Sequence, residues 1–308
     1  MSLPGKVLKK VLQQFPYVKS LQDRVAGFEK YISFPPGHYY SPLVEAGEYF
    51  AQQKKPASLP SYEPKEIEFN KEKQTSLLHG FVPFYNEMPF GEKPEHGLRF
   101  GFDNVFFTYA DAIGMYCMMR NMRPARIIEI GSGFSSALLL DTNERFFDGQ
   151  IDISFIEPDP ERLKANLKAN EQVTIIEKKI QEVDLAFFDK LEAGDFLLID
   201  TSHVSKSGSD VNHIYFNILP HLKLGVFVHI HDIFFPFEYP EKWVVEERRG
   251  WNEVFLLRAF LAYNSAFRMV FFNDYIQQSE GPFLAEQMPL FLQRNSTVCG
   301  GLWMCREA

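Results

Sequence analysis

Acidic and histidine side chains gather at the ends of two apolar stretches in the second half of the chain. Asp200 closes the segment DFLLID and is followed three residues later by His203, while GVFVHIHDIFF contains His231 and Asp232. An imidazole near neutral pKa is a good general base, and a neighbouring carboxylate can orient it. Carboxylate oxygens are also the ligands that Mg²⁺ prefers. The sequence therefore predicts four catalytic candidates, of which Asp200 and Asp232 are also the candidate metal ligands: Asp200, His203, His231 and Asp232.

Other interpretations of these residues stay open. Asp200 could contact a cofactor or cap a helix, and Asp232 could do no more than orient a histidine. A set that is rich in histidine, with His203, His229 and His231, would suit a softer metal than Mg²⁺. Of His229 and His231 we expect only one to face the cleft, and we favour His231 because it adjoins Asp232.

A glycine turn and an acidic residue form a second constellation. The segment ARIIEIGSGFSS ends an apolar run in Glu129 and a G-x-G turn, and ISFIEPDP ends the next apolar run in Glu157. Glycines let the backbone turn sharply and approach a ligand closely. A carboxylate at the end of the second strand can accept hydrogen bonds from ribose hydroxyls. We therefore expect a nucleoside cofactor at this turn.

The elements that would position these residues alternate between short apolar strands and amphipathic helices from Asn104 onward. We expect seven strands, over residues 125–131, 151–157, 173–180, 195–200, 225–235, 267–275 and 300–307. Helices are expected over residues 105–122, 135–147, 160–170, 211–222, 251–264 and 280–293. The alternation predicts an α/β fold in which helices cover both faces of a Rossmann-like, mostly parallel sheet, with one antiparallel strand near the C-terminus.

Residues 1–103 differ in composition from the remainder. Prolines and a charged EPKEIEFNKEK stretch predict long loops and short helices there, so we divide the chain into a substrate-shaping cap, 1–103, and a catalytic domain, 104–308. The basic first 21 residues lack the continuous apolar core of a signal peptide and are interpreted as a solvated helix face. No apolar run reaches the roughly 18 residues of a membrane span.

Composition excludes some classes of function. The formal net charge of -8 argues against a general nucleic-acid-binding protein, which needs a basic surface. The three cysteines, Cys117, Cys299 and Cys305, have no metal-finger spacing and fit a reducing compartment better than a disulfide framework. We expect a cytoplasmic protein that acts on a small molecule, and the sequence leaves a homo-oligomer open.

The order E-x-G-x-G, followed by a strand that ends in Glu, resembles the class I S-adenosylmethionine-dependent methyltransferases. The resemblance covers roughly residues 104–308 and implies that S-adenosylmethionine is the cofactor. It implies that Glu157 holds the ribose and that residues after the third strand flank the adenine. The implied cofactor-binding residues are Glu129, Gly131, Ser132, Gly133, Ser135, Glu157, Ile180, Gln181 and Asp200.

The histidine and aspartate pair resembles the site of the catechol-type, metal-dependent O-methyltransferases. Two departures stand out: His203 occupies the place of a basic lysine, and His231-Asp232 replaces an Asp-Asn pair. The segments GHYYSP, DTSH, HIHDIF and GG-x-W also resemble bacterial methyltransferase-domain proteins encoded among sugar and secondary-metabolite genes. These resemblances imply methyl transfer to a small-molecule hydroxyl, with a divalent cation such as Mg²⁺ as an additional cofactor.

Two other functions compete with this interpretation. The alternating pattern would also fit an NAD(P)-dependent oxidoreductase, but Ser136 stands where a dinucleotide fingerprint has its third glycine, and Glu129 would repel a pyrophosphate. A methyltransferase-like module without activity is the second alternative, because a fold can outlive its catalysis. An intact glycine turn beside a polar cleft argues against it.

Overall fold

The computed structural model describes residues 15–30, 32–53, 63–107, 109–168, 171, 173–293 and 300–308 of the chain. The basic segment before residue 15 and Cys299 lie outside these residues. The chain divides into two compact units, Met1–Gln52 with Lys242–Gly250, and Gln53–Glu241 with Trp251–Ala308. Among its described residues, the smaller unit contains the helices α2 (Pro16–Glu29) and α3 (Ala46–Gln53) and the π-helical turn η5 (Lys242–Glu246).

The larger unit is built on a seven-stranded sheet with the order β3-β2-β1-β4-β5-β7-β6. Only β7 runs antiparallel to its neighbours, β5 and β6, so the expected α/β fold with one antiparallel strand is confirmed. The central parallel strands, those that start at Arg126, Phe196 and Phe227, are almost entirely buried, as parallel strands covered on both faces must be, whereas the edge strand that starts at Thr174 is not. The strands are β1 (Arg126–Ile130), β2 (Asp152–Ile156), β3 (Thr174–Ile176), β4 (Phe196–Ile199), β5 (Phe227–His231), β6 (Phe267–Phe272) and β7 (Gly301–Arg306).

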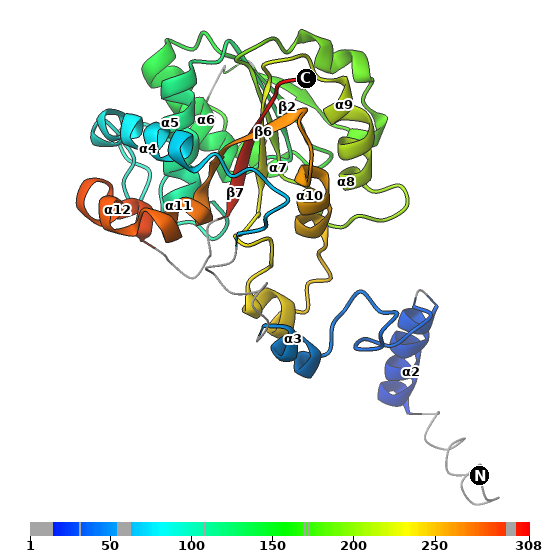
Figure 1. Ribbon diagram of the computed structural model, residues 1–308. Helices are drawn as coiled ribbons and strands as arrows, with labels where there is room; N and C mark the ends of the chain where they lie inside the picture. The colour runs from blue at the N-terminus through cyan, green and yellow to red at the C-terminus, as the bar shows by residue number, and fades with distance from the viewer. Residues whose placement is uncertain are drawn as a thin grey trace, which may run out of the picture. The chain divides into compact units, whose positions relative to one another are not determined.

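Helices flank the sheet on both sides, with α4, α5, α6, α11 and α12 on one side and α8, α9 and α10 on the other (Figure 1). The α-helices are α4 (Lys71–Asn86), α5 (Tyr109–Met122), α6 (Phe134–Phe147), α7 (Glu161–Asn166), α8 (Asp210–His213), α9 (Leu219–His221), α10 (Glu253–Leu261), α11 (Asn273–Ser279) and α12 (Gly281–Gln287). Shorter helical turns are η2 (Ile180–Glu182), η3 (Leu185–Lys190), η4 (Ile214–Ile218) and η6 (Pro289–Leu292).

Three strands are much shorter than the sequence predicts: the third, the fifth, which ends at His231 rather than at Phe235, and the sixth. The third strand pairs only with β2 and stops at Ile176, because the next residues, Glu177 to Lys179, are charged and have no apolar side chain to bury. The sixth strand stops at Phe272. There the buried Asn273 donates a hydrogen bond to Asp111 of α5, 2.9 Å away, and the chain turns into α11. A buried amide needs such a partner, and the straight strand would not provide it.

The core lies between the sheet and the helices that cover it, and it is rich in aromatic side chains. Fully buried rings include Phe100, Phe155, Phe196 and Trp303. Within the described part of the chain, no helix combines the length and the apolar character that crossing a membrane requires.

Candidate active site

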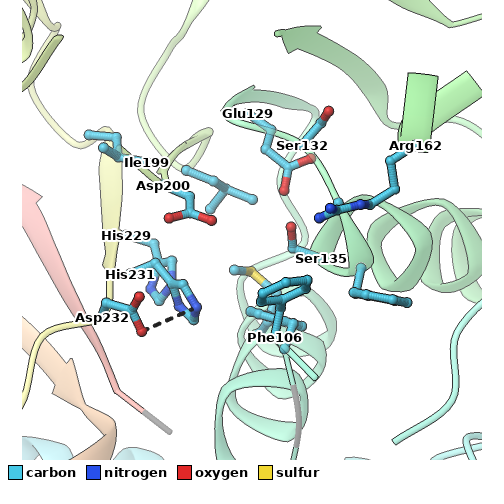
Figure 2. Close-up of a pocket in the computed structure, with 15 residues that line it drawn as sticks. Phe106, Glu129, Ser132, Ser135, Arg162, Ile199, Asp200, His229, His231 and Asp232 are labelled. Atoms are coloured by element: carbon cyan, nitrogen blue, oxygen red, sulfur yellow. Dashed lines mark ion pairs between the residues drawn. The ribbon is translucent and has the colours of Figure 1, made fainter. Parts of the chain in front are cut away.

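Polar side chains meet where β1, β4 and β5 end at the same edge of the sheet. The register pairs Ile130 with Ile199 and Ile199 with Ile230, so the turns that follow these strands lie beside one another. A cavity opens at this edge (Figure 2). Its lining consists of Phe106, Phe107, Met115, Glu129, Ser132, Gly133, Phe134, Ser135, Arg162, Leu198, Ile199, Asp200, His229, His231 and Asp232.

A second hollow lies next to this cavity and shares Asp200 with it. It is lined by Gly131 and Glu157, and by Ile180 and Gln181 of η2. The structure therefore brings Ile180 and Gln181 to the same hollow as Glu157, although they follow the third strand and Glu157 follows the second. Every residue that the sequence assigned to a cofactor lines one of the two spaces.

The glycine turn after β1 requires glycine at its first position. Gly131 has a φ of +81°, and a Cβ there would lie 2.4 Å from the backbone oxygen of Asp200. The turns after β1 and β4 can approach this closely only because no side chain intervenes. The N–H of Gly133 donates to Ser136 Oγ (3.0 Å), and Ser136 in turn donates to the carboxylate of Glu129. The residue in place of a third glycine thus connects the turn to Glu129.

Glu129 is a buried carboxyl group that faces the cavity. Its residue is only 3 % exposed, and burial raises its pKa to about 8, against the opposing effect of hydrogen bonds from Ser135 and Ser136. The nearby carboxylates of Asp200 and Glu157 raise the pKa further. In the unliganded protein Glu129 is therefore mostly protonated at neutral pH, and a cationic ligand would favour its ionised form.

Glu157 holds the glycine turn through its side chain. Ser132 N–H donates to Glu157 Oε2 over 3.0 Å, and Asp159 N–H donates to the other carboxylate oxygen over 2.9 Å. The carboxylate thus keeps the end of β2 and the turn after β1 in a fixed relation. Its remaining lone pairs face the hollow that it lines.

The imidazole of His203 lies among three carboxylates. Its Nε2 is 3.3 Å from Asp200 Oδ1 and 3.4 Å from Asp232 Oδ2, and its Nδ1 is 2.9 Å from Glu253 Oε2. The ring also contacts Trp251, with centroids 4.2 Å apart and ring planes tilted by 40°. Backbone N–H groups of Asn252 and Glu253 donate to the His203 carbonyl, which ties this loop to the start of α10.

The pKa of His203 differs from the near-neutral value that the sequence suggested. Burial alone would lower it, but the hydrogen bonds with Asp200 and Glu253, and the charge of Asp232, raise it to about 10. Without a bound cation the ring is an imidazolium at neutral pH, so it has no lone pair with which to take a proton. The role of His203 as a general base stays a prediction, and in the unliganded protein the surrounding carboxylates favour its protonated form.

His203 and Asp232 share an unusual backbone conformation. Their φ angles are +58° and +56°, in the left-handed region that residues other than glycine seldom adopt. Such strain persists only where the surrounding structure enforces it, and it concentrates at functional sites. Here it brings the Nε2 of one residue and the Oδ2 of the other together. Asp200, His203 and Asp232 each offer a ligand atom, and these atoms lie within 4.8 Å of one another.

Both His229 and His231 line the cavity, contrary to our expectation that only one would. Residues two apart on a strand point to the same face, so the two rings lie together, with centroids 6.0 Å apart. His231 Nε2 lies 3.7 Å from Asp232 Oδ1. The Nδ1 of His231 and both ring nitrogens of His229 are buried and have no hydrogen-bond partner among the described residues.

The pKa values of the two histidines shift in opposite directions. Burial lowers the pKa of His229 to well below its ordinary value. Burial would also lower that of His231, but Asp232, Asp200 and Asp111 together raise it. Asp111, on α5, is one of the site residues that the sequence did not reveal. It is buried, accepts hydrogen bonds from Asn273 and from Gly300 N–H, and has a pKa that burial raises to about 6.

Comparison with known proteins identifies a family whose model matches the part of the chain that contains this site. Residues 128–233, which contain the glycine turn, Asp200, His203 and Asp232, match the model of a family described as "Methyltransferase domain". An uncharacterised protein of Archaeoglobus fulgidus is 35 % identical over 163 residues, which are 52 % of this chain and 74 % of that protein. The strand order, with its antiparallel β7 between β5 and β6, agrees with a class I methyltransferase fold.

The chain belongs with the methyltransferase-domain proteins. Solved structures similar to the methyltransferase include a putative O-methyltransferase from Klebsiella pneumoniae, 13 % identical, with a TM-score of 0.42 over 85 % of this chain and 96 % of that one. Another is the O-methyltransferase TomG from Streptomyces achromogenes in complex with SAM, 13 % identical, with a TM-score of 0.41 over 86 % of this chain and all of that one.

In this methyltransferase, Glu253 and Trp251 complete the surroundings of His203, and neither could be recognised from the sequence. Glu253 begins an ordinary amphipathic helix, α10, some 50 residues after His203, and Trp251 lies just before that helix. An acidic residue in the first turn of a helix is usually explained by the helix dipole. What distinguishes Glu253 is complete burial, which only the tertiary structure provides.

Proposed function

We propose that the protein transfers the methyl group of S-adenosylmethionine to a hydroxyl oxygen of a small-molecule acceptor, in the sugar or secondary-metabolite class. One observation carries this proposal: Asp200 and Asp232, which contact His203, line the same cavity as Glu129 and the glycine turn. An acceptor hydroxyl at that cluster would lie beside the donor region. Because the leaving group is neutral, positioning of the two reactants supplies most of the rate effect.

The residues that would bind the cofactor are those that line the cavity and the neighbouring hollow. Glu129, Ser132, Gly133, Ser135 and Asp200 line the cavity, where the amino-acid portion would lie. Gly131, Glu157, Ile180 and Gln181 line the hollow assigned to the ribose and adenine. When bound, S-adenosylmethionine supplies an electrophilic methyl group on a sulfonium ion. The protein contributes acidic side chains for its cationic groups and a polar carboxylate for its hydroxyls.

The donor set of Asp200, His203 and Asp232 fits a divalent cation. Two carboxylate oxygens and one imidazole nitrogen converge within 4.8 Å. Glu253 would accept the Nδ1–H of His203 and leave Nε2 toward the two aspartates, the arrangement by which metal-binding histidines are commonly oriented. A bound cation would lower the pKa of an acceptor hydroxyl as a Lewis acid. In this proposal His203 is catalytic as a ligand rather than as a base.

His231 is then the group that would take the acceptor proton. It lines the cavity, its Nδ1 has no partner within the described chain, and Asp232 lies 3.7 Å from its Nε2. Deprotonation of the hydroxyl by an oriented histidine is worth about 10²–10⁴ in rate. His231→Ala should therefore lower turnover by about that factor and leave cofactor affinity nearly unchanged.

Calorimetric titrations with S-adenosylhomocysteine and with NADH test the cofactor assignment directly. We expect S-adenosylhomocysteine to bind and NADH not to bind. Glu157→Ala should weaken binding of the former by roughly 1.5–3 kcal/mol, the value of hydrogen bonds to a charged group. Binding of NADH alone would favour an oxidoreductase, and binding of neither at millimolar concentration would indicate a module without activity.

A further inference from the structure

The cavity contains one charge that the methyl-transfer chemistry does not use. Arg162, the second residue of α7, is the only arginine or lysine among the described residues that line it. The other ionisable lining residues are the carboxyl groups Glu129, Asp200 and Asp232, and two histidines. A guanidinium in a cavity otherwise dominated by acidic groups calls for an explanation.

The neighbours of Arg162 place its guanidinium at the glycine turn. Its Nη1 lies 3.8 Å from the position that a Cβ on Gly133 would occupy, and its Cζ lies 5.0 Å from the centre of the Phe106 ring. Figure 2 shows the side chain reaching from α7 into the cavity on the side of Ser135, with Asp232 on the opposite side. The cation–π contact with Phe106 orients the group but does not neutralise its charge.

No carboxylate within the described part of the chain forms an ion pair with Arg162. The acids of the cavity instead use other partners: Glu129 accepts from Ser136, and Asp200 and Asp232 face His203. The five donors of the guanidinium are therefore available to a ligand at the glycine turn. A planar fork of this kind matches a carboxylate, with which it can form two parallel hydrogen bonds.

We propose that Arg162 binds the carboxylate of the methionine portion of S-adenosylmethionine. This inference rests on the proposed function, which places the methionine portion along Glu129, Ser132 and Gly133. That portion carries two positive groups, the sulfonium and the ammonium, and one negative group. The cavity has the complementary layout at the turn, with Glu129 and Asp200 for the cations and Arg162 for the anion.

An anionic acceptor fits Arg162 less well. The proposed acceptor position is defined by Asp232 and His231 on β5, whereas Arg162 approaches the turn after β1. The two groups lie on opposite sides of the cavity in Figure 2. A carboxylate that contacts both the glycine turn and Arg162 belongs to the ligand that occupies the turn.

The test compares three nucleosides whose amino-acid portions differ. S-adenosylhomocysteine has the ammonium and the carboxylate, its decarboxylated analogue has the ammonium alone, and 5′-methylthioadenosine has neither. Calorimetry on the full chain would measure the affinity of the wild type and of Arg162→Gln for each. We expect Arg162→Gln to bind S-adenosylhomocysteine about tenfold more weakly, as for the loss of a charge-assisted hydrogen bond at a partly exposed site, and the other two within twofold of the wild type.

Two further variants sharpen the comparison. Glu129→Gln should weaken both ligands that carry the ammonium and spare 5′-methylthioadenosine, a pattern different from that of Arg162→Gln. Arg145→Gln removes the same charge from the exposed end of α6 and should change no affinity. Circular dichroism would verify that every variant is folded.

The outcomes separate this assignment from the proposed function. Equal weakening of all three ligands by Arg162→Gln would overturn the assignment and indicate that Arg162 supports the cavity wall through Phe106. Unchanged affinity for S-adenosylhomocysteine in Arg162→Gln would overturn it as well. If the wild type binds none of the three, the cofactor proposal fails, and the assignment of Arg162 fails with it.

Discussion

Replacement of Glu253 by glutamine tests how the proposed cation site is built. Glu253 is completely buried, and its Oε2 lies 2.9 Å from Nδ1 of His203 while it also accepts a hydrogen bond from Thr201. Glutamine has nearly the same shape, so the variant removes a charge and little else. Its amide oxygen can still accept the Nδ1–H, but its NH₂ group would point toward a buried position where Glu253 Oε1 has no partner among the described residues.

The expected loss follows from this geometry. Without the negative charge behind it, the imidazole is a weaker ligand, and loss of such an outer partner lowers metal affinity by about 10–100-fold. We therefore expect Glu253→Gln to bind Mn²⁺ about 10–100-fold more weakly than the wild type, as measured by electron paramagnetic resonance of free Mn²⁺. Asp232→Asn removes a ligand itself and should weaken binding more.

Glu286→Gln provides the control, because Glu286 is an exposed acid on α12 and should leave Mn²⁺ affinity unchanged. Equal Mn²⁺ affinity in Glu253→Gln and the wild type would refute the reasoning, since Glu253 would then have no influence on the ligand that it contacts. A wild type that binds no Mn²⁺ would show instead that the three groups hold only a proton.

Three other predictions concern the turn, the acid beside it and the N-terminal region. Gly131→Ala should destabilise the fold by several kcal/mol in thermal unfolding, because a backbone clash adds to the roughly 1–2 kcal/mol cost of the left-handed conformation. Gly149 is also left-handed (φ +71°) but lies in open space, so Gly149→Ala should show only the conformational cost. Affinity for S-adenosylhomocysteine should rise as pH increases from about 6 to 8, because Glu129 ionises over this range. The proton on Glu129 also stabilises the unliganded fold; this stabilisation is complete below pH 4.5 and is lost as pH rises through about 8. A Glu129→Gln variant that keeps either trend would contradict this prediction. Residues 1–103 expressed alone should show no cooperative melt by circular dichroism, because α4 packs on α5 and β6 of the remaining chain.

The sequence was sufficient to predict the sheet because each strand is a local apolar run. At β1, the apolar segment RIIEI predicts a strand, and the glycines that follow it predict a sharp turn. Strand ends were harder to predict. Asn273 ends β6 because its amide bonds Asp111, which is 162 residues away in the sequence.

The site was predictable where its residues end strands and unpredictable where they do not. Asp200 and Asp232 follow β4 and β5, whose carboxyl ends a parallel sheet must bring together. Glu253 and Arg162 lie on helices, and nothing in their local sequence distinguishes them from surface charges. The sequence placed His203 near Asp200, which raises its pKa most, but it did not reveal the further contribution of Glu253, which lies 50 residues away in the sequence.

The unliganded site compensates its negative charge with protons. Glu129, Asp200, Asp232 and Glu253 converge on one edge of the sheet, where four unpaired carboxylates would repel one another strongly. Burial keeps a proton on Glu129 up to about pH 8, and the surrounding acids keep His203 protonated to about pH 10. The first proton lies where the ligand's ammonium would bind, and the second lies between the two aspartates where a cation would bind. The raised pKa of His203 thus reflects the acids around it, whereas that of Glu129 reflects mainly its burial.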